Sequence, residues 1–409
     1  MPINKTNDQK RRVVVTGLGV VSSIGIGVDD FWKNLIAGKS GISEIESFDT
    51  SQYPIHKGGE VKNFKPEHFI DRRKIKFLGR ASQMAIAAAK LAVEDAKLPK
   101  KYFNELGVFL GTTMGEIREL EKIDIGLSGK SWDAIQQSLV SLFPTSVITT
   151  NVGIEFKARG NSYMLPSACS AGNYSIGYAF DLIKSGELDS ALVGGSDSFS
   201  RIAFTGFNRL MAMAPDKCQP FDKNRKGMML AEGSGILVLE SLEYAQKRGA
   251  KIYAEILGYG LSCDAYHMTH PLEEGVIKCM EKALKESNIS KDEVDYISAH
   301  GTGTAQNDKT ECAAIKKVFK NRNKPILCSS IKSMLGHSLG AASAIEAIAC
   351  CLTIENGIIP PTINYEALDE ECDIDCIPNK ARKYGVKIAL NNSYAFGGNN
   401  ACIIFRKFK

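Results

Sequence analysis

The residue best placed for nucleophilic chemistry is Cys169, within the small-residue segment 166–172. The segment lies where an apolar stretch gives way to a helix predicted over 170–185. Free N–H groups at a helix N-terminus favour the thiolate and lower the pKa of a thiol, and small neighbours let an acyl group approach it. A buried core cysteine is the alternative interpretation, because free cysteines are usually buried.

Two histidines and one loop could act with this thiol. His300 and His337 each follow a predicted strand and lie in a glycine-bearing loop, where rigid scaffolds often present active-site side chains. The small-residue loop 392–400 also follows a strand and could offer a backbone N–H to a developing oxyanion. Together these features favour a catalytic site over four unrelated structural roles.

The elements that would position these residues alternate between strands and helices. This alternation predicts an α/β layered architecture with largely buried sheets. A charged helical segment at 240–251 precedes a new start of the strand pattern, which predicts two similar halves, 1–250 and 251–409. The expected strands are 12–16, followed by a glycine-rich turn, then 106–110, 190–193, 235–239, 252–257, 294–298, 325–328, 386–390 and 401–405, and the main expected helices are 81–96, 170–185, 275–287 and 338–354.

Composition narrows the class of protein. The chain has 409 residues, 44% of them hydrophobic, and 51 basic against 46 acidic residues, a mild balance that does not favour nucleic-acid binding. Its eleven cysteines are odd in number and show neither a disulfide framework nor a zinc pattern, so we expect a reducing cytoplasm and no metal. The polar N-terminus does not resemble a signal peptide, and no apolar run predicts a membrane span.

The motifs, taken in order, resemble those of the β-ketoacyl-acyl carrier protein synthases, most closely the type II long-chain elongating members. The resemblance runs from 13–17 to 401–405 and includes the segments 220–223, 231–235, 262–268 and 360–364. It implies a thiolase-like fold, five-layered αβαβα, built from two pseudo-repeated halves. The implied reaction is the decarboxylating Claisen condensation of an acyl thioester held on Cys169 with malonyl-acyl carrier protein in fatty acid elongation, without a cofactor.

Carried over residue by residue, the resemblance gives each candidate a role. His300 and His337 would donate N–H groups to the enolate formed by decarboxylation, and Lys332, paired with Glu346, would tune the site. The backbone N–H groups of Cys169 and Phe396 would form the oxyanion hole, and Phe396 would gate access to the thiol. The same resemblance assigns Thr302 and Thr304 to pantetheine binding, Met114 and Met228 to the acyl pocket, and Arg72, Arg73 and Lys74 with Arg80, and separately Arg209, to docking of the acidic carrier protein.

Some positions depart from the family pattern and keep alternatives open. Ala395 replaces a flexible glycine, and the adaptable side chains of Met114 and Met228 lie at the expected acyl pocket. These changes leave a ketosynthase of a specialised polyene or type II polyketide pathway as an alternative. A non-catalytic chain-length partner is disfavoured because the nucleophile is present. A thiolase would need a late catalytic cysteine, whereas Cys402 belongs to the terminal strand, and a plant-type ketosynthase would use an asparagine in place of the second histidine. We expect a homodimer, or a heterodimer with a related subunit.

Overall fold

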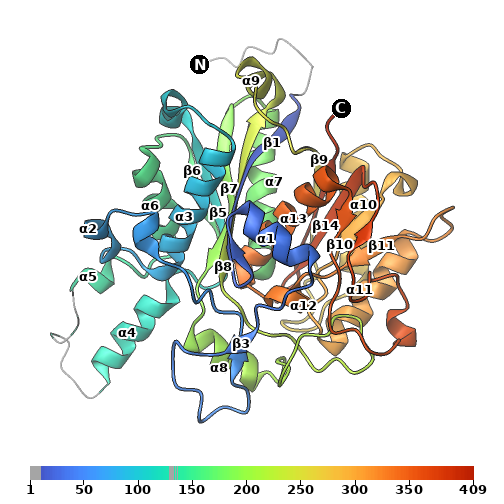
Figure 1. The fold of residues 1–409 in the computed structure, drawn as a ribbon, viewed down its shortest axis with the longest axis horizontal. Helices are drawn as coiled ribbons and strands as arrows, with labels where there is room; N and C mark the ends of the chain where they lie inside the picture. The colour runs from blue at the N-terminus through green and yellow to red at the C-terminus, as the bar shows by residue number, and fades with distance from the viewer. Residues whose placement is uncertain (1–10, 129–132, 134, 136) are drawn as a thin grey trace.

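Eleven strands form one sheet in this computed structural model, which describes residues 11–128, 133, 135 and 137–409 (Figure 1). From edge to edge the order is β11 (Leu327–Ser329), β10 (Tyr296–Ser298), β14 (Ile388–Tyr394), β15 (Asn399–Arg406), β9 (Ala254–Cys263), β1 (Val13–Ser22), β8 (Gly233–Ser241), β7 (Ser190–Asp197), β5 (Gly107–Gly111) and β6 (Ser162–Leu165). The eleventh strand, β2 (Gly25–Ile26), pairs with β1 alone. Two short ribbons, β3 (Ser43–Glu44) with β4 (Lys57–Gly58) and β12 (Ile358–Ile359) with β13 (Arg382–Lys383), lie outside this sheet.

The sheet has the same pairing pattern on both sides of its middle. Strands β6, β5 and β7 are parallel, and β7, β8 and β1 are antiparallel. On the other side β11, β10 and β14 are parallel, and β14, β15 and β9 are antiparallel. The two sets meet where Val13 of β1 lies opposite Ile256 of β9, so that the halves share one continuous sheet.

Helices form three layers around these strands. The helices α7 (Ala171–Lys184) and α13 (Ala342–Asn356) contact strands of both sets and lie between them (Figure 1). On one outer side α3 (Arg80–Asp95) packs with α6 (Val147–Phe156), and on the other α10 (Glu273–Glu286) packs with α11 (Ala305–Val318). The remaining helices are α1 (Val28–Ile36), α2 (Arg72–Ile75), α4 (Ile117–Leu127), α5 (Gln137–Val140), α8 (Arg201–Arg209), α9 (Leu242–Lys247) and α12 (Lys332–Leu335), with 3-10 turns η1 (Pro66–His68), η2 (Lys100–Glu105), η4 (Ala168–Ser170), η5 (Lys291–Glu293), η6 (Leu339–Ala341) and η7 (Glu370–Cys372).

The two central helices begin in the same way. The 3-10 turn η4 leads into α7, and η6 leads into α13. Each turn opens on a non-glycine residue with positive φ, Ala168 at 52° and Leu339 at 54°. The position of Cys169 in the first turn therefore corresponds to Gly340 in the second, so the repeated geometry presents a thiol in one half only.

All nine predicted strands are present, but the glycine-rich turn expected after residue 16 is wrong. Strand β1 continues through Gly17 and Gly19 as far as Ser22. A Cβ atom on Gly17 would lie 2.2 Å from the carbonyl oxygen of Ala92, and one on Gly19 would lie 1.9 Å from that of Ala88. These glycines therefore allow helix α3 to pack directly against the backbone of β1.

The stretch Leu339–Asn356 is the longest apolar helical segment of the described residues. By length and composition it could cross a membrane, contrary to the expectation that no such run exists. However, 89% of the stretch is buried inside the protein, where α13 packs between the two sets of strands. Its apolar character is accounted for by its place in the central layer.

Candidate active site

Cys169 lies in η4 at the start of α7 and is only 6% exposed. Burial raises the pKa of its thiol to about 11, and the positive charge of Lys332 and the backbone N–H of Phe396 oppose this rise. We had expected the helix N-terminus to lower the thiol pKa, but desolvation outweighs the favourable groups. In the free protein the sulfur is therefore held as a thiol.

His300 and His337 lie side by side, with ring centroids 5.4 Å apart and planes at 84°. Burial, followed by the charge of Lys332, lowers the pKa of both imidazoles well below the usual value. Both rings are therefore neutral at pH 7. Each Nδ1 is buried without a hydrogen-bond partner among the described residues, which leaves Nε2 as the nitrogen that can present an N–H to the cavity.

Lys332 connects the two histidine loops. It begins α12, is 2% exposed, donates from Nζ to the carbonyl oxygen of His300 at 2.7 Å, and forms an ion pair with Glu346. Burial raises the pKa of Glu346 to about 7, with Lys332 as the main opposing influence. The lysine thus fixes the loop of His300 and places a positive charge beside both imidazoles.

The sequence analysis missed two buried carboxylates on α11. Glu311 accepts the backbone N–H groups of His300 at 2.9 Å and Gly301 at 2.8 Å, and burial raises its pKa to about 7. Asp308 accepts the N–H groups of Gly303 at 3.2 Å and Phe221 at 2.9 Å. Their spacing of three residues could have identified them, because residues three apart share one face of a helix and this helix directly follows the His300 loop.

A gate loop, residues 395–400, carries Phe396 next to the thiol. The loop is tied to the nucleophile because Ser393, at its base, donates to the carbonyl oxygen of Cys169 at 3.0 Å. The ring of Phe396 packs on Phe207 with centroids 5.9 Å apart. Gly397 and Gly398 have φ of 85° and 78°, whereas Ala395 is not in the left-handed region, so the alanine at this position carries no backbone strain.

A cavity of about 300 Å³ contains the thiol and both imidazoles. Thr302 and Thr304 line it, with their hydroxyl oxygens 2.9 Å apart, and Met228 lines it as well. Met114 is absent from the described lining and instead packs with the cluster that includes Phe199 and Phe204. The remaining lining residues are Phe207, Leu210, Met211, Ala212, His267, Met268, Thr269, His270, Pro271, Ala305, Gln306, Asn307, Tyr394, Ala395, Phe396 and Gly398.

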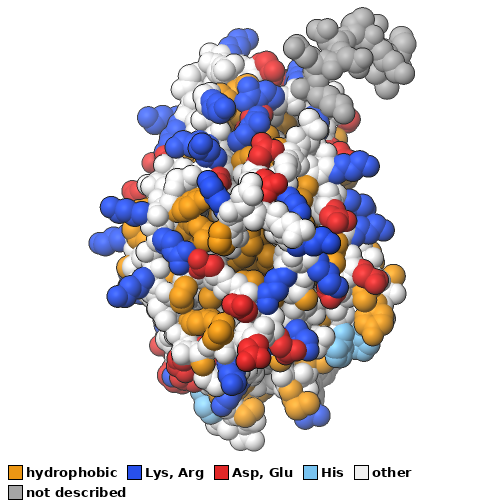
Figure 2. Space-filling view, turned by 90° about the vertical axis from the view of Figure 1, so that its right-hand side faces the viewer, with side chains coloured by type: hydrophobic (Ala, Val, Ile, Leu, Met, Phe, Trp, Pro, Cys, Tyr) orange, Lys and Arg blue, Asp and Glu red, His pale blue; other side chains and the backbone are white. Residues whose placement is uncertain are grey.

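The basic residues expected to dock a carrier protein do not form one group. Arg72, Arg73 and Lys74 lie on α2, which Figure 1 places apart from α8, whose last residue is the exposed Arg209. Arg73 pairs with Asp71 and Lys74 with Glu155 at 2.9 Å. Figure 2 shows one face on which Lys and Arg are dispersed among Asp and Glu. Of the residues expected to dock the carrier, Arg209 is the one whose chain neighbours, Phe207 and Leu210, line the cavity.

Arg80, which we had grouped with the docking residues, is a structural side chain. Its guanidinium binds the buried carboxylate of Glu232 through two hydrogen bonds of 2.8 and 2.6 Å. Glu232 also accepts the backbone N–H groups of Val61 and Phe199. The prediction for Arg80 is wrong because its charge is neutralised inside the protein.

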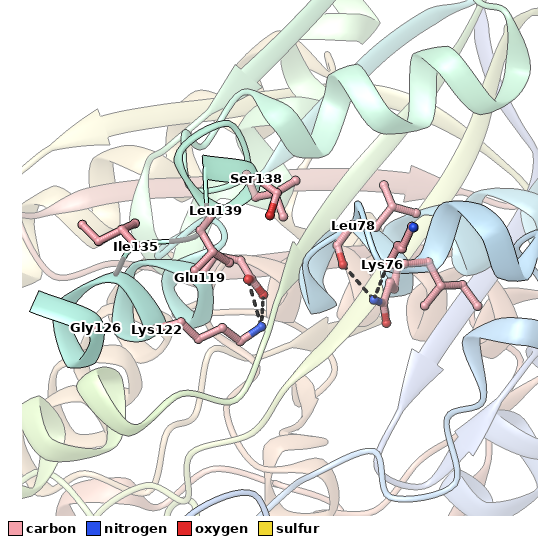
Figure 3. Close-up of a pocket in the computed structure, with 11 residues that line it drawn as sticks. Lys76, Leu78, Glu119, Lys122, Gly126, Ile135, Ser138 and Leu139 are labelled. Atoms are coloured by element: carbon pink, nitrogen blue, oxygen red, sulfur yellow. Dashed lines mark hydrogen bonds and ion pairs between the residues drawn. The ribbon is translucent and has the colours of Figure 1, made fainter. Parts of the chain in front are cut away.

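A second cavity, of about 510 Å³, lies between the α2 segment and helices α4 and α5 (Figure 3). Its charged lining residues include Glu119 and Lys122, which pair at 2.8 Å, and much of the remaining described lining is apolar. It contains neither Cys169 nor the two imidazoles. Its larger volume therefore does not make it the better candidate for catalysis.

Comparisons with known proteins identify the family of the chain. The family model described as "Beta-ketoacyl synthase, N-terminal domain" matches residues 10–245, and "Beta-ketoacyl synthase, C-terminal domain" matches residues 253–366. The chain is 39% identical over 414 residues to a protein named 3-oxoacyl-[acyl-carrier-protein] synthase 2 from Synechocystis sp., covering 98% of this chain and 100% of that protein. It is also 39% identical over 411 residues to a protein of the same name from Staphylococcus aureus, covering 98% of this chain and 99% of that protein.

Solved structures extend the likeness to three dimensions. One described as the ishigamide ketosynthase/chain length factor is 45% identical with a TM-score of 0.95, covering 98% of this chain and 100% of the other. Another, described as the AntDE:AntF type II PKS acyl-carrier protein in complex with its ketosynthase bound to the hexaketide, is 36% identical with a TM-score of 0.89, at the same coverages.

Proposed function

Since the chain belongs to the β-ketoacyl synthase family, we propose that it condenses an acyl group held on Cys169 with a malonyl group carried by acyl carrier protein. The observation that carries this proposal is one cavity containing a buried thiol and two neutral imidazoles. A neutral imidazole can donate a hydrogen bond to an enolate without protonating it readily, which is what decarboxylative condensation requires.

The first step transfers the primer to the protein. The sulfur of Cys169 attacks the carbonyl carbon of the incoming acyl thioester, and its proton passes to the departing pantetheine sulfur. The backbone N–H groups of Cys169 and Phe396 stabilise the oxyanion of the tetrahedral intermediate. Because burial raises the thiol pKa to about 11, the thiolate forms only during this transfer and not in the resting protein.

The second step forms the new carbon–carbon bond. The malonyl group loses carbon dioxide, and the electron pair of the broken bond becomes an enolate whose oxygen accepts N–H groups from His300 and His337. The enolate carbon then attacks the acyl carbonyl on Cys169, and the carbon–sulfur bond breaks to give the β-ketoacyl-carrier product and a thiolate, which takes up a proton. Thr302 and Thr304 hold the pantetheine arm by hydrogen bonds, and Met228 contacts the acyl chain.

Two pathways are candidates for this condensation reaction. The relatives named 3-oxoacyl-[acyl-carrier-protein] synthase 2 favour fatty acid elongation. The alternative, a ketosynthase of a specialised polyene or type II polyketide pathway, is supported by the likeness to the ishigamide ketosynthase/chain length factor and to a type II PKS ketosynthase. Intact-mass analysis of condensation with malonyl-acyl carrier protein and primers of graded length and unsaturation separates them. Cys169→Ala is the matched control, and product that persists in this variant would overturn the mechanism.

We also propose that the protein dimerises through β6. This edge strand is exposed, unlike β11 at the opposite edge, which is buried. Tyr163 on β6 and Tyr178 on α7 are 48% and 40% exposed and pack together with ring centroids 5.6 Å apart. A strand with one unpaired edge and exposed aromatic rings beside it fits antiparallel pairing with the same strand of a second copy, or of a related chain-length subunit.

Light scattering coupled to gel filtration tests this assembly. Tyr163→Asp is expected to give a monomer, whereas Tyr266→Asp, a substitution of another exposed tyrosine, should leave the oligomer intact. A dimer that survives Tyr163→Asp would refute pairing through β6.

Three further assignments belong to the same proposal. The halves 1–250 and 251–409 form the two repeats, carrying the nucleophile and the histidines respectively. The eleven cysteines are all free, which fits a reducing cytoplasm. Arg209 is the docking residue we favour for the acidic carrier, because it lies beside the cavity, whereas Arg73 and Lys74 already have acidic partners.

A further inference from the structure

We propose that His267, Thr269 and His270 bind a divalent transition-metal ion of the zinc and nickel class at the entrance of the Cys169 cavity. These residues belong to the mouth loop, residues 264–271, which follows β9 and lines the cavity. The two imidazoles are exposed, and their ring centroids lie 4.4 Å apart. Imidazole nitrogen is a preferred ligand of these metals.

The geometry that carries the proposal is a triangle of three donor atoms. The Nδ1 atoms of His267 and His270 are 2.9 Å apart, and the hydroxyl oxygen of Thr269 lies 3.4 Å from each of them. A circle through these three atoms has a radius of about 1.9 Å. Because metal to imidazole distances are about 2.0–2.1 Å, an ion just outside the plane of the triangle would reach all three atoms. It would take over the lone pair of His267 Nδ1 that now accepts the backbone N–H of Thr269.

A metal ion can take the place of the proton that now lies between the two imidazoles. His267 Nδ1 accepts the backbone N–H of Thr269 at 3.1 Å, so the proton between the two Nδ1 atoms belongs to His270. Metal binding replaces this proton, which moves to Nε2 of the same ring through solvent, and each ring stays neutral. Among the residues that the structure describes, no three His, Cys, Asp or Glu side chains form a metal cluster, so the hydroxyl of Thr269 and water complete the coordination.

The site has a direct connection to the gate loop. The carbonyl oxygen of Met268 accepts the N–H of Gly397 at 2.8 Å, and Asp264 donates its N–H to Gly398 at 3.0 Å. The carboxylate of Asp264 is already bound by Asn400 and by the N–H of Leu272, so it is not free to act as a ligand. A metal ion that fixes the mouth loop would therefore also hold the gate loop, with Phe396, in its present position and slow the opening that gives a reagent access to Cys169.

Titration of tag-free protein with NiCl2 in a calorimeter tests the site directly. The background variant Cys263→Ser removes the exposed thiol at the end of β9. We expect His270→Gln to weaken nickel binding at least tenfold, whereas His68→Gln, which removes an exposed histidine on η1, should leave it unchanged. Equal binding by both variants, or the absence of binding, would overturn the proposal.

The inhibitory consequence is measured separately, as the rate of iodoacetamide alkylation of Cys169 followed by peptide mass spectrometry. Nickel should slow this reaction at least fivefold in the Cys263→Ser protein and leave the His270→Gln variant unaffected, and chelation should restore the rate. Alkylation that nickel does not slow, despite binding, would refute closure. Inhibition of condensation by the metal rests on the proposed function, whereas nickel binding and alkylation of Cys169 can be measured without it. If metal-free protein fails to condense, the proposed function is overturned but the metal site is not.

Discussion

Replacing Lys332 with methionine is expected to move the acid limb of the pH–activity profile to higher pH. Methionine matches the length of the lysine stem but carries no charge. In the wild type, burial and then the charge of Lys332 lower the pKa of His300 and His337. The variant removes the second cause and keeps the first. Both imidazole pKa values should therefore rise while remaining below that of a solvent-exposed histidine.

The size of this rise follows from Coulomb's law. A unit charge acting across roughly 6 Å at an effective dielectric constant of about 20 contributes about 3 kcal/mol, or a change in pKa of about two. Glu346 does not cancel the effect, because its pKa, about 7 beside Lys332, rises further when the lysine is lost and the carboxyl becomes protonated. The active form contains neutral imidazoles, so activity disappears at a higher pH as acid is added.

The assay is the decarboxylation of malonyl-acyl carrier protein under single-turnover conditions between pH 4.5 and 8. Glu346→Gln is the matched control, because a carboxyl with a pKa of about 7 is already mostly protonated at the acid limb, so this substitution should leave that limb where it lies in the wild type. Loss of either partner of a buried pair destabilises a protein by about 3–5 kcal/mol, so thermal unfolding must first show that both variants are folded. Acid limbs that overlay in all three proteins would refute the electrostatic role of Lys332.

Three further predictions test the scaffold and the gate. Burial raises the pKa of Glu116 to about 7, so the native state binds a proton more tightly than the unfolded chain. The free energy of unfolding of the wild type should therefore fall as the pH rises from about 4.5 to 7. In urea unfolding this fall should exceed that of Glu116→Gln by about 3 kcal/mol. Gly19→Ala should lower the free energy of unfolding by at least about 3 kcal/mol, because the added Cβ has no room. The control Gly206→Ala, in open space on α8, should leave that free energy unchanged or raise it by up to about 1 kcal/mol. Equal denaturation midpoints for the two variants would refute the packing argument. Ala395→Gly should loosen the gate loop and speed alkylation of Cys169 severalfold, and an unchanged rate would show that the alanine does not stiffen it.

The fold was predictable from sequence where strands are buried on both faces. Continuous apolar runs identified nine strands, and the matches to ketosynthase structures confirm the predicted thiolase-like fold. Strand β6 was missed because it is a half-exposed edge strand with no such run. The helix α11 was missed because its exposed face is highly charged and its buried face carries acidic residues, which hide the apolar period.

The candidate site was predictable only for residues that belong to motifs. Cys169, His300 and His337 lie in short glycine-rich or small-residue segments, and the structure places all three around one cavity. Glu311 and Asp308 could not be identified in this way, because their importance comes from burial beneath the His300 loop and not from a local pattern. The role of Arg80 was misjudged for the related reason that a sequence shows a positive charge but not the buried carboxylate opposite it.

The position of β1 has a consequence for how the chain folds. This strand is made first but lies in the middle of the sheet, where Val13 pairs with Ser241 on one side and with Ile256 on the other. Only the two-residue β2 pairs with it early, because its long partners β8 and β9 begin at Gly233 and Ala254. An apolar segment that is fully buried in the finished protein therefore waits without most of its pairs. Non-local pairing of this kind slows folding and exposes strand edges. We therefore expect the nascent chain to depend on chaperones until β9 has been synthesised.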